Sequence, residues 1–559
     1  MNIENILAPY GAVPTEIQYE WLNRKTAFIH LTVNTFTGKE WGDGTESPSI
    51  FNPEKLDARK WISALKEAGF TTAILTAKHH DGFCLWPSKY TEHSIKNSPY
   101  KNGKGDIVRE FTNACKEFGL QAGIYLSPWD RNHPQWATPV YDEYYMNQLT
   151  ELLTEYGEIY EIWWDGAGSD KANYKWEEWV KIVRKYQPKC AIFGPTQTAH
   201  LNDIRWVGNE RGEAAKDCFA TLDIEVLKSE DRYEMVKGLN AGTPNGKRFI
   251  PAEADVSIRP GWFYHPEQDE MVKTPEDLVD YWFTSAGKNS GILLNVPPTP
   301  EGLFHEIDCK NLLIWNEYIK DIFKTNLAEN AEISGNSISA EYSSENLLNE
   351  NDTYFVSDDK SAEITFNFKA PITFNCFKMG EEIRLGQRVR EFAVEYLENG
   401  EFKPIIAGQS IGFCRAEYFD DVTTTAVRLK IKKAEMNPIL KCFGLYVMNK
   451  NYFPKPKPEY YQKELTKLPT AKITKVEDGF EVDFGGIYTF SRFVFVSDGV
   501  PKYEIFAFDG QEYQSIYKGE NPSTVEVCFF KPVDYAYKVK LALYDCEIGD
   551  DRSISVMYE

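Results

Sequence analysis

A carboxylate followed by glycines marks the stretch of this chain where residue types and spacing best suit catalysis. Residues 159–164 form a mostly apolar run without alternation, which predicts a buried parallel strand, and Asp165 follows it directly. Gly166 and Gly168 allow the backbone to turn sharply there and keep side chains away from a ligand. Catalytic residues of (β/α)₈ barrels lie at the carboxyl ends of the strands, so Asp165 is the first candidate for chemistry.

Short apolar runs and longer amphipathic runs alternate from residue 20 to about residue 320, and these elements would position Asp165. The predicted strands are 27–33, 72–76, 121–126, 160–164, 190–194, 204–208, 249–254 and 291–296. The predicted helices are 57–68, 107–118, 140–156, 176–186, 275–286 and a closing helix at 304–324. Eight strands alternating with helices predict an α/β fold, a (β/α)₈ barrel of the TIM type.

The pattern changes after residue 326. Period-2 alternation, as in 362–368, predicts antiparallel strands. We therefore expect four parts, in which the catalytic barrel is followed by antiparallel β-sandwich domains. They are the barrel at 1–326, a β-sandwich at 327–448, a linker rich in proline and lysine at 449–470, and a second small β-sandwich at 471–559.

The predicted strand ends share a composition suited to sugar binding, because aromatic residues stand beside imidazoles, amides and carboxylates. Aromatic faces cover the apolar patches of a pyranose, while the polar groups meet its hydroxyls. The candidate substrate-binding residues are His30, Glu40, Trp41, His79, His80, Tyr125, Trp163, Glu253, Arg259 and Trp262.

Glycoside cleavage needs two carboxyl groups with different pKa values, roughly 5–5.5 Å apart when the anomeric configuration is retained. Asp165 is the candidate nucleophile. Glu210 and Glu253 are both candidates for the general acid/base, and their spacing in the sequence does not choose between them.

Composition argues against several other classes of protein, namely nucleic-acid-binding, membrane-spanning and metal-dependent ones. The net charge is −22 and no Lys/Arg stripe is present, so nucleic acid and anionic membranes are poor partners. No apolar run approaches the roughly 18 residues of a membrane span. The ten cysteines are scattered singly and the pair His79–His80 has no third imidazole nearby, so we expect no metal and no cofactor. An oligosaccharide or glycoconjugate is the expected partner.

Several of these segments together resemble the α-L-fucosidases of glycoside hydrolase family 29, over about residues 20–320. They are His30, 79–83, 163–166, 208–210 and 252–262. The resemblance implies a retaining mechanism with Asp165 as nucleophile, and a fucose site lined by His30, the paired histidines, Trp163 and Trp262. Residues 207–210 resemble the branch specific for α-1,3/1,4-linked fucose, which implies that Glu210 is the acid/base.

The resemblance also implies that the first sandwich is a carbohydrate-binding-like module of the discoidin (F5/8) type. The family suggests a periplasmic or secreted protein, but the numbered chain begins without a signal-peptide pattern, so a cytoplasmic location stays open.

Two other functions also stay open: a non-catalytic carbohydrate-binding protein, and a barrel glycosidase for a different terminal sugar. The β modules could bind sugar or simply pack on the barrel, and the oligomeric state is not indicated.

Overall fold

The computed structural model describes residues 3–168, 172–228, 232–348, 352–454, 465–467, 471–496, 500–508, 510, 512–520, 525–546 and 554–557. The chain forms two compact units, Met1–Phe453 and Pro454–Glu559. Within the residues just given, no helix has both the length and the apolar character needed to cross a membrane.

In the described part of the chain, eight parallel strands form the central sheet of the first unit, which confirms the predicted barrel. Their order is β5–β4–β3–β2–β1–β10–β9–β6. An isolated parallel bridge between Phe193 and Ile204 joins the two edges. The strands are β1 (Lys25–Ile29), β2 (Thr72–Lys78), β3 (Gln121–Leu126), β4 (Glu161–Trp163), β5 (Ala191–Phe193), β6 (Arg205–Trp206), β9 (Ala252–Ser257) and β10 (Ser290–Asn295).

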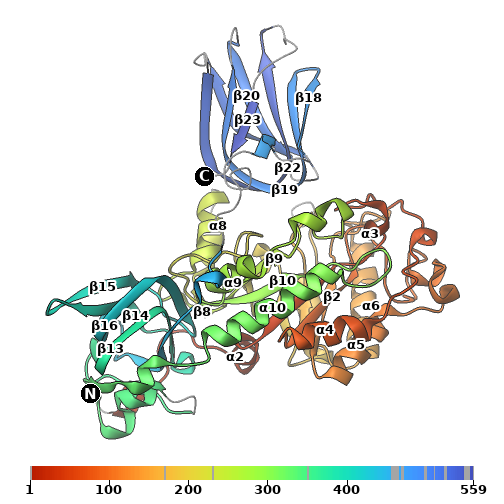
Figure 1. The fold of residues 1–559 in the computed structure, drawn as a ribbon. Coiled ribbons are helices and arrows are strands. Elements are labelled where there is room, and N and C mark those ends of the chain that lie inside the picture. The colour runs from red at the N-terminus through yellow and green to blue at the C-terminus, as the bar shows by residue number, and fades with distance from the viewer. Residues whose placement is uncertain are drawn as a thin grey trace. The chain divides into compact units, whose positions relative to one another are not determined.

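Helices surround these strands (Figure 1). Capping residues mark their ends, as in α5 (Ile107–Phe118). Asp106 accepts a hydrogen bond from the backbone N–H of Arg109 (2.9 Å) at its start, and Gly119, with a φ of 70°, is the C-cap that follows its last residue. The major helices agree with the predicted ranges within a few residues. They are α4 (Ala58–Glu67), α5 (Ile107–Phe118), α6 (Pro139–Glu155), α7 (Trp176–Tyr186), α9 (Pro275–Thr284) and α10 (Glu306–Ile322). Shorter helices are α1 (Ile3–Leu7), α2 (Glu16–Leu22), α3 (Asn34–Thr37) and α8 (Arg232–Ala241).

The seventh predicted strand, 249–254, is wrong in its bounds. Its first residues belong to β8 (Arg248–Phe249), which pairs antiparallel with β7 (Thr221–Leu222) outside the barrel. The barrel strand β9 begins only at Ala252. Pro251 has no backbone N–H to donate, so it separates the two strands even though the apolar run continues through it.

The sixth strand is also shorter than the predicted range 204–208. β6 contains two residues, and Gly208 turns the backbone with a φ of 88° just beyond it. Residues 207–220 then connect β6 to β7 without a helix or strand. We call this segment the β6–β7 connection.

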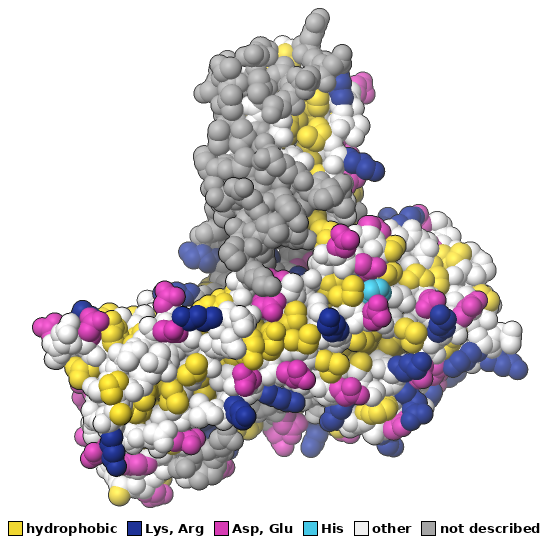
Figure 2. Space-filling model, viewed as in Figure 1, with side chains coloured by type: hydrophobic (Ala, Val, Ile, Leu, Met, Phe, Trp, Pro, Cys, Tyr) yellow, Lys and Arg dark blue, Asp and Glu magenta, His cyan; other side chains and the backbone are white. Residues whose placement is uncertain are grey.

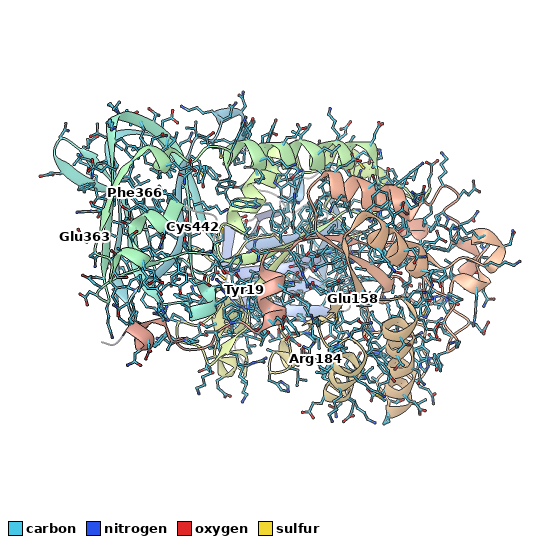
Figure 3. All side chains as sticks on the ribbon, turned by 90° about the horizontal axis from the view of Figure 1, so that it is seen from below. Tyr19, Glu158, Arg184, Glu363, Phe366 and Cys442 are labelled. Atoms are coloured by element: carbon cyan, nitrogen blue, oxygen red, sulfur yellow. The ribbon has the colours of Figure 1, made fainter. Side chains whose placement is uncertain are left out.

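An antiparallel sheet follows the barrel and confirms the predicted β-sandwich architecture. Its strands have the order β12–β17–β13–β16–β14–β15, and β11 pairs with β13. Alternation along β13 places Phe366 in the core and exposes half of the Glu363 side chain, which pairs with Lys430 at 2.7 Å (both β13 residues are labelled in Figure 3). The strands are β11 (Glu332–Gly335), β12 (Phe355–Val356), β13 (Ala362–Glu381), β14 (Val389–Glu398), β15 (Glu401–Gly408), β16 (Arg415–Ala434) and β17 (Ile439–Tyr446).

The second unit contains another antiparallel sheet, with the order β18–β19–β22–β20–β21 and with β23 paired to β19. Most of the predicted linker, 449–470, lies outside the described residues. The strands are β18 (Lys472–Val476), β19 (Gly479–Val496), β20 (Lys502–Phe508), β21 (Tyr513–Glu520), β22 (Val525–Tyr544) and β23 (Ile554–Met557).

Candidate active site

Most of the predicted site residues come together at the carboxyl ends of the barrel strands, where their rings form a continuous network of contacts. The ring centroids are 5.6 Å apart for His30–His79, 5.7 Å for His79–Tyr125, 5.5 Å for Tyr125–Trp163, 5.2 Å for His30–Trp262 and 5.5 Å for Trp41–His80. These residues come from the ends of β1 to β4 and from the segments that follow β1 and β9. The network therefore forms an aromatic and imidazole surface of the kind that binds a sugar ring.

Asp165 lies two residues beyond β4, inside this network. Its Oδ2 accepts a hydrogen bond from Tyr125 Oη at 3.0 Å, and its Oδ1 accepts one from the backbone N–H of Ala167 at 2.8 Å. About a quarter of its side chain (27%) is exposed, so a substrate can reach it. The turn beyond it requires glycine, because Gly168 has a φ of 70° and a Cβ there would lie 2.8 Å from Trp129. Asp165 is thus both accessible and fixed in orientation.

Glu210 lies in the β6–β7 connection and is half-buried. Its Oε2 accepts a hydrogen bond from Trp262 Nε1 at 2.9 Å. Asn209 holds the surrounding backbone, since its Oδ1 accepts from Arg211 N (3.0 Å) and its Nδ2 donates to Glu213 O (2.8 Å). The indole that bounds the site therefore also orients this carboxyl group.

The environment of Glu210 favours its protonated form. Burial raises its pKa well above the ordinary value, and the negative charge of Asp255 raises it further. The charges of Asp165 and Glu40 act in the same direction, and the hydrogen bond from Trp262 opposes them. A carboxyl group in this condition can donate a proton near neutral pH.

The three histidines are neutral. Burial lowers the pKa of His30 to about 3 and that of His80 to about 4, and it lowers the pKa of His79 well below its ordinary value. His30 Nδ1 lies 2.8 Å from Asn295 Oδ1, an acceptor, so Nδ1 carries the proton and Nε2 is left as an acceptor. His80 Nδ1 likewise lies 2.8 Å from Ser127 Oγ, whose own proton goes to Trp129 O. Both rings can therefore accept a hydrogen bond from a hydroxyl group.

Glu40 lies beside the site and supports the segment after β9. Its Oε2 accepts from the backbone N–H of Trp262 at 2.8 Å, and its Oε1 lies 2.6 Å from His265 Nε2. Burial acts to lower the pKa of His265, but the hydrogen bond and charge of Glu40 outweigh it and the pKa is raised. Glu40 thus fixes the backbone that carries the Trp262 indole.

Glu253 does not lie among the strand ends. It is the second residue of β9, fully buried, and its Oε1 accepts from Trp163 Nε1 at 3.0 Å. Burial and the charge of Glu161 raise its pKa well above the ordinary value. This geometry supports neither the expected substrate contact nor an acid/base role, because the carboxyl group lies within the barrel, with its Oε1 engaged by Trp163.

Arg259 also differs from the expectation of a substrate contact. Its side chain is fully buried, and its Nε and Nη2 each donate to Asp308 on α10 at 2.9 Å. Its Nη1 donates to Asp269 at 2.7 Å. With both sides of the guanidinium engaged, Arg259 ties the segment after β9 to α10.

Sequence reasoning assigned no role to two further residues of the site. Asp255 Oδ1 accepts from Trp206 Nε1 at 2.8 Å, and burial raises the pKa of Asp255 to about 7 against that hydrogen bond. Asn295 contacts His30, as described above, and donates to Trp262 O at 2.8 Å. The predicted strand 249–254 placed Asp255 at its carboxyl end, and the polar alternation Glu253–Asp255–Ser257 was a further signal, but neither indicated what Asp255 contacts.

No group of three or more His, Cys, Asp or Glu side chains suited to a metal ion occurs among the residues that the structure describes. Acidic and basic side chains are intermixed on the face drawn in Figure 2. At the site itself, the groups described above are neutral histidine rings, aromatic rings and the carboxyl groups of Asp165 and Glu210.

The family model of the α-L-fucosidases matches residues 8–321. This chain belongs to the α-L-fucosidase family, glycoside hydrolase family 29. "Alpha-L-fucosidase 1" of Arabidopsis thaliana is 38% identical over 468 residues, which cover 80% of this chain and 90% of that family member.

Solved structures of fucosidase-family proteins share the fold. A structure from Bacteroides thetaiotaomicron has a TM-score of 0.77 and 46% identity, covering 79% of this chain and 99% of that one. A Ruminococcus gnavus GH29 fucosidase, solved in complex with fucose, has a TM-score of 0.74 and 31% identity, covering 80% and 97%.

Proposed function

We propose that this chain is a retaining exo-α-L-fucosidase that hydrolyses terminal α-1,3/1,4-linked fucose from branched, Lewis-type glycans. The observation that carries the proposal is the contrast between two carboxyl groups in one aromatic site. Asp165 is accessible and oriented by Tyr125, whereas Glu210 has a strongly raised pKa and is oriented by Trp262. Retaining glycosidases use such a pair, one group as nucleophile and one as proton donor.

In the proposed first step, Asp165 attacks the anomeric carbon of fucose while Glu210 donates its proton to the glycosidic oxygen. The bond from the anomeric carbon to that oxygen breaks, and the aglycone leaves as an alcohol. In the second step, Glu210 takes a proton from water, which attacks the fucosyl–Asp165 ester and releases fucose with its original configuration. Fucose hydroxyl groups would donate to the Nε2 atoms of His30 and His80, whose Nδ1 atoms are engaged by Asn295 and Ser127.

The linkage preference is supported by the resemblance of residues 207–210 and by the position of Glu210. A proton donor must lie on the side of the leaving group, so a connection that carries the donor also faces the aglycone. We expect kcat/KM to be at least about tenfold higher for Lewis trisaccharides than for a linear α-1,2-fucoside, because remote contacts help to position the reacting bond. Omitting the branching galactose should lower kcat/KM as well. Initial rates of fucose release from purified oligosaccharides measure this, and equal efficiency on linear and branched substrates would contradict it.

Substitution of Asp255 should change the pH dependence of kcat/KM. Its negative charge raises the pKa of Glu210, so Asp255→Asn should lower that pKa. Glu210 would then lose its proton at a lower pH, and the alkaline limb of kcat/KM for a Lewis trisaccharide should move towards acid. The pH–rate profile measures the shift, with Glu213→Gln on the exposed side of the same connection as a control that should leave the limb in place. An unmoved limb in Asp255→Asn would separate Asp255 from the proton donor.

A further inference from the structure

Side chains and backbone groups of the first β-sandwich form hydrogen bonds with residues 216–220, the second half of the β6–β7 connection. Asp217 Oδ1 accepts from the backbone N–H groups of Gln409 (2.7 Å) and Ser410 (3.1 Å). Ser410 Oγ donates to Cys218 O at 2.6 Å. Arg415 donates to Lys216 O. These contacts bring sandwich residues from about 190 positions further along the chain onto a short backbone segment.

Gln387 completes this set of contacts. Its Oε1 accepts from the backbone N–H of Ala220 at 3.0 Å, and its Nε2 donates to Ser410 Oγ at 2.7 Å. Gln387, Ser410 and Arg415 are each at most 3% exposed. Water cannot readily replace hydrogen bonds that are buried in this way, so their loss would leave backbone groups unsatisfied.

The held segment continues the backbone that carries Glu210. The first half of the β6–β7 connection is hydrogen-bonded by the barrel, where Ala214 N donates to Thr284 O at 2.9 Å and Asn240 Nδ2 donates to Glu213 O at 2.8 Å. The connection has no ladder or helix of its own, so its buried polar groups need partners from outside. Barrel and sandwich together supply these partners. At residues 216–220 the sandwich bonds stand beside barrel bonds, since Asn289 Nδ2 also donates to Cys218 O (2.9 Å) and Phe219 N donates to Ala241 O (2.7 Å).

We propose that Gln387, Ser410 and Arg415 are positioning residues for Glu210, and that the first sandwich thereby forms part of the catalytic unit. This inference rests on the proposed function, in which Glu210 is the general acid/base. A looser segment at 216–220 would allow the Glu210 backbone to shift, and small displacements of a catalytic group strongly lower its efficiency. The loss should be greatest for substrates whose leaving group needs a proton.

The test compares Ser410→Ala and the double variant Ser410→Ala/Gln387→Ala with Tyr418→Phe. Tyr418 Oη donates to Asp280 on α9 at 2.9 Å, so its loss removes one hydroxyl hydrogen bond across the same interface without touching 216–220. We expect kcat/KM of the double variant to fall about tenfold on a Lewis trisaccharide and less than about twofold on an activated aryl fucoside. Hydrogen–deuterium exchange of peptides spanning 207–220 should accelerate in the double variant and stay unchanged in Tyr418→Phe.

Equal losses on both substrates, or exchange in 207–220 that matches the Tyr418→Phe control, would overturn the inference. If the double variant does not fold, the single Ser410→Ala variant provides the same comparison, because it removes the hydrogen bond from the sandwich to Cys218 O and leaves the one from Asn289 Nδ2 on the barrel side. The proposed function fails separately if the wild-type chain releases no fucose or if Glu210→Ala shows no leaving-group dependence. If the wild type and Glu210→Ala behave as proposed but the Ser410 and Gln387 variants behave like the Tyr418→Phe control, only the positioning role is rejected.

Discussion

Asp165→Gly should lower turnover of every fucoside by several orders of magnitude while leaving the fold intact. Without the nucleophile no fucosyl ester forms, so both chemical steps of the double displacement are lost. The side chain is partly exposed and lies at the surface of the site, so its removal should cost little stability. Initial rates and thermal unfolding of the same preparation measure both effects.

Rescue of Asp165→Gly by azide would show that the lost activity is that of the nucleophile. The anion can occupy the space of the missing carboxylate and attack the anomeric carbon from the face that Asp165 used. The product should be the inverted β-fucosyl azide, formed only with an activated aryl fucoside and only in the variant. Glu213→Ala, which removes an exposed carboxylate, is the control and should keep wild-type turnover. Near-wild-type turnover in Asp165→Gly, or an azide of retained configuration, would remove Asp165 from the role.

Glu210→Ala should show the second-largest effect, and it should depend on the leaving group. General acid catalysis contributes about 10²–10⁴-fold, so a Lewis trisaccharide should lose roughly that factor in kcat/KM. An aryl fucoside with a good leaving group needs no proton in the first step and should lose far less. Its fucosyl–enzyme ester should then accumulate, because the second step still needs a base. Pre-steady-state release of the aryl group, followed by slow turnover, measures this.

An external nucleophile or base should accelerate only the second step of Glu210→Ala. Glu253→Gln provides the matched control, since Glu253 is the other glutamate that sequence reasoning considered for the acid/base. Its carboxyl group lies inside the barrel against Trp163, so its substitution should change stability without leaving-group dependence. If Glu253→Gln shows that dependence and Glu210→Ala does not, the assignment of the acid/base is wrong.

Local sequence patterns were sufficient to predict the barrel and the residues at its strand ends. A strand that ends on Asp165, or on His79–His80, places those side chains at the mouth of a parallel barrel wherever the other strands lie. The aromatic network is a consequence of that common edge. For these residues, the apolar periodicity of about a dozen neighbouring positions was enough to predict where each strand ends.

The remaining features depend on distant partners. Arg259 takes its partner Asp308 from 49 positions away, and no local pattern distinguishes a buried structural arginine from a substrate ligand. The choice between Glu210 and Glu253 depends on where β9 begins, which Pro251 decides by interrupting an apolar run. The contacts of Gln387 and Ser410 with the β6–β7 connection join the sandwich to the barrel. Neither the sandwich sequence nor the connection contains a local pattern that predicts them.

The closure of the barrel between β5 and β6 has a consequence for how such an enzyme can change. β4, from which Asp165 extends, pairs with β3 on one side and β5 on the other. Within the described chain, β6 pairs along its length only with β9. The seam to β5 is closed by the bridge Phe193–Ile204, by the backbone bond from Asp203 N to Ile192 O (2.9 Å) and by Arg184 (labelled in Figure 3), which binds Asp203. The β6–β7 connection, which carries the proposed proton donor Glu210, leaves the barrel from the two-residue strand β6. A change in its length would disturb its hydrogen bonds to the barrel helices and to the sandwich but no strand ladder, whereas moving Asp165 would require rebuilding the sheet. Redesign of the accepted leaving group therefore has its natural starting point in the β6–β7 connection.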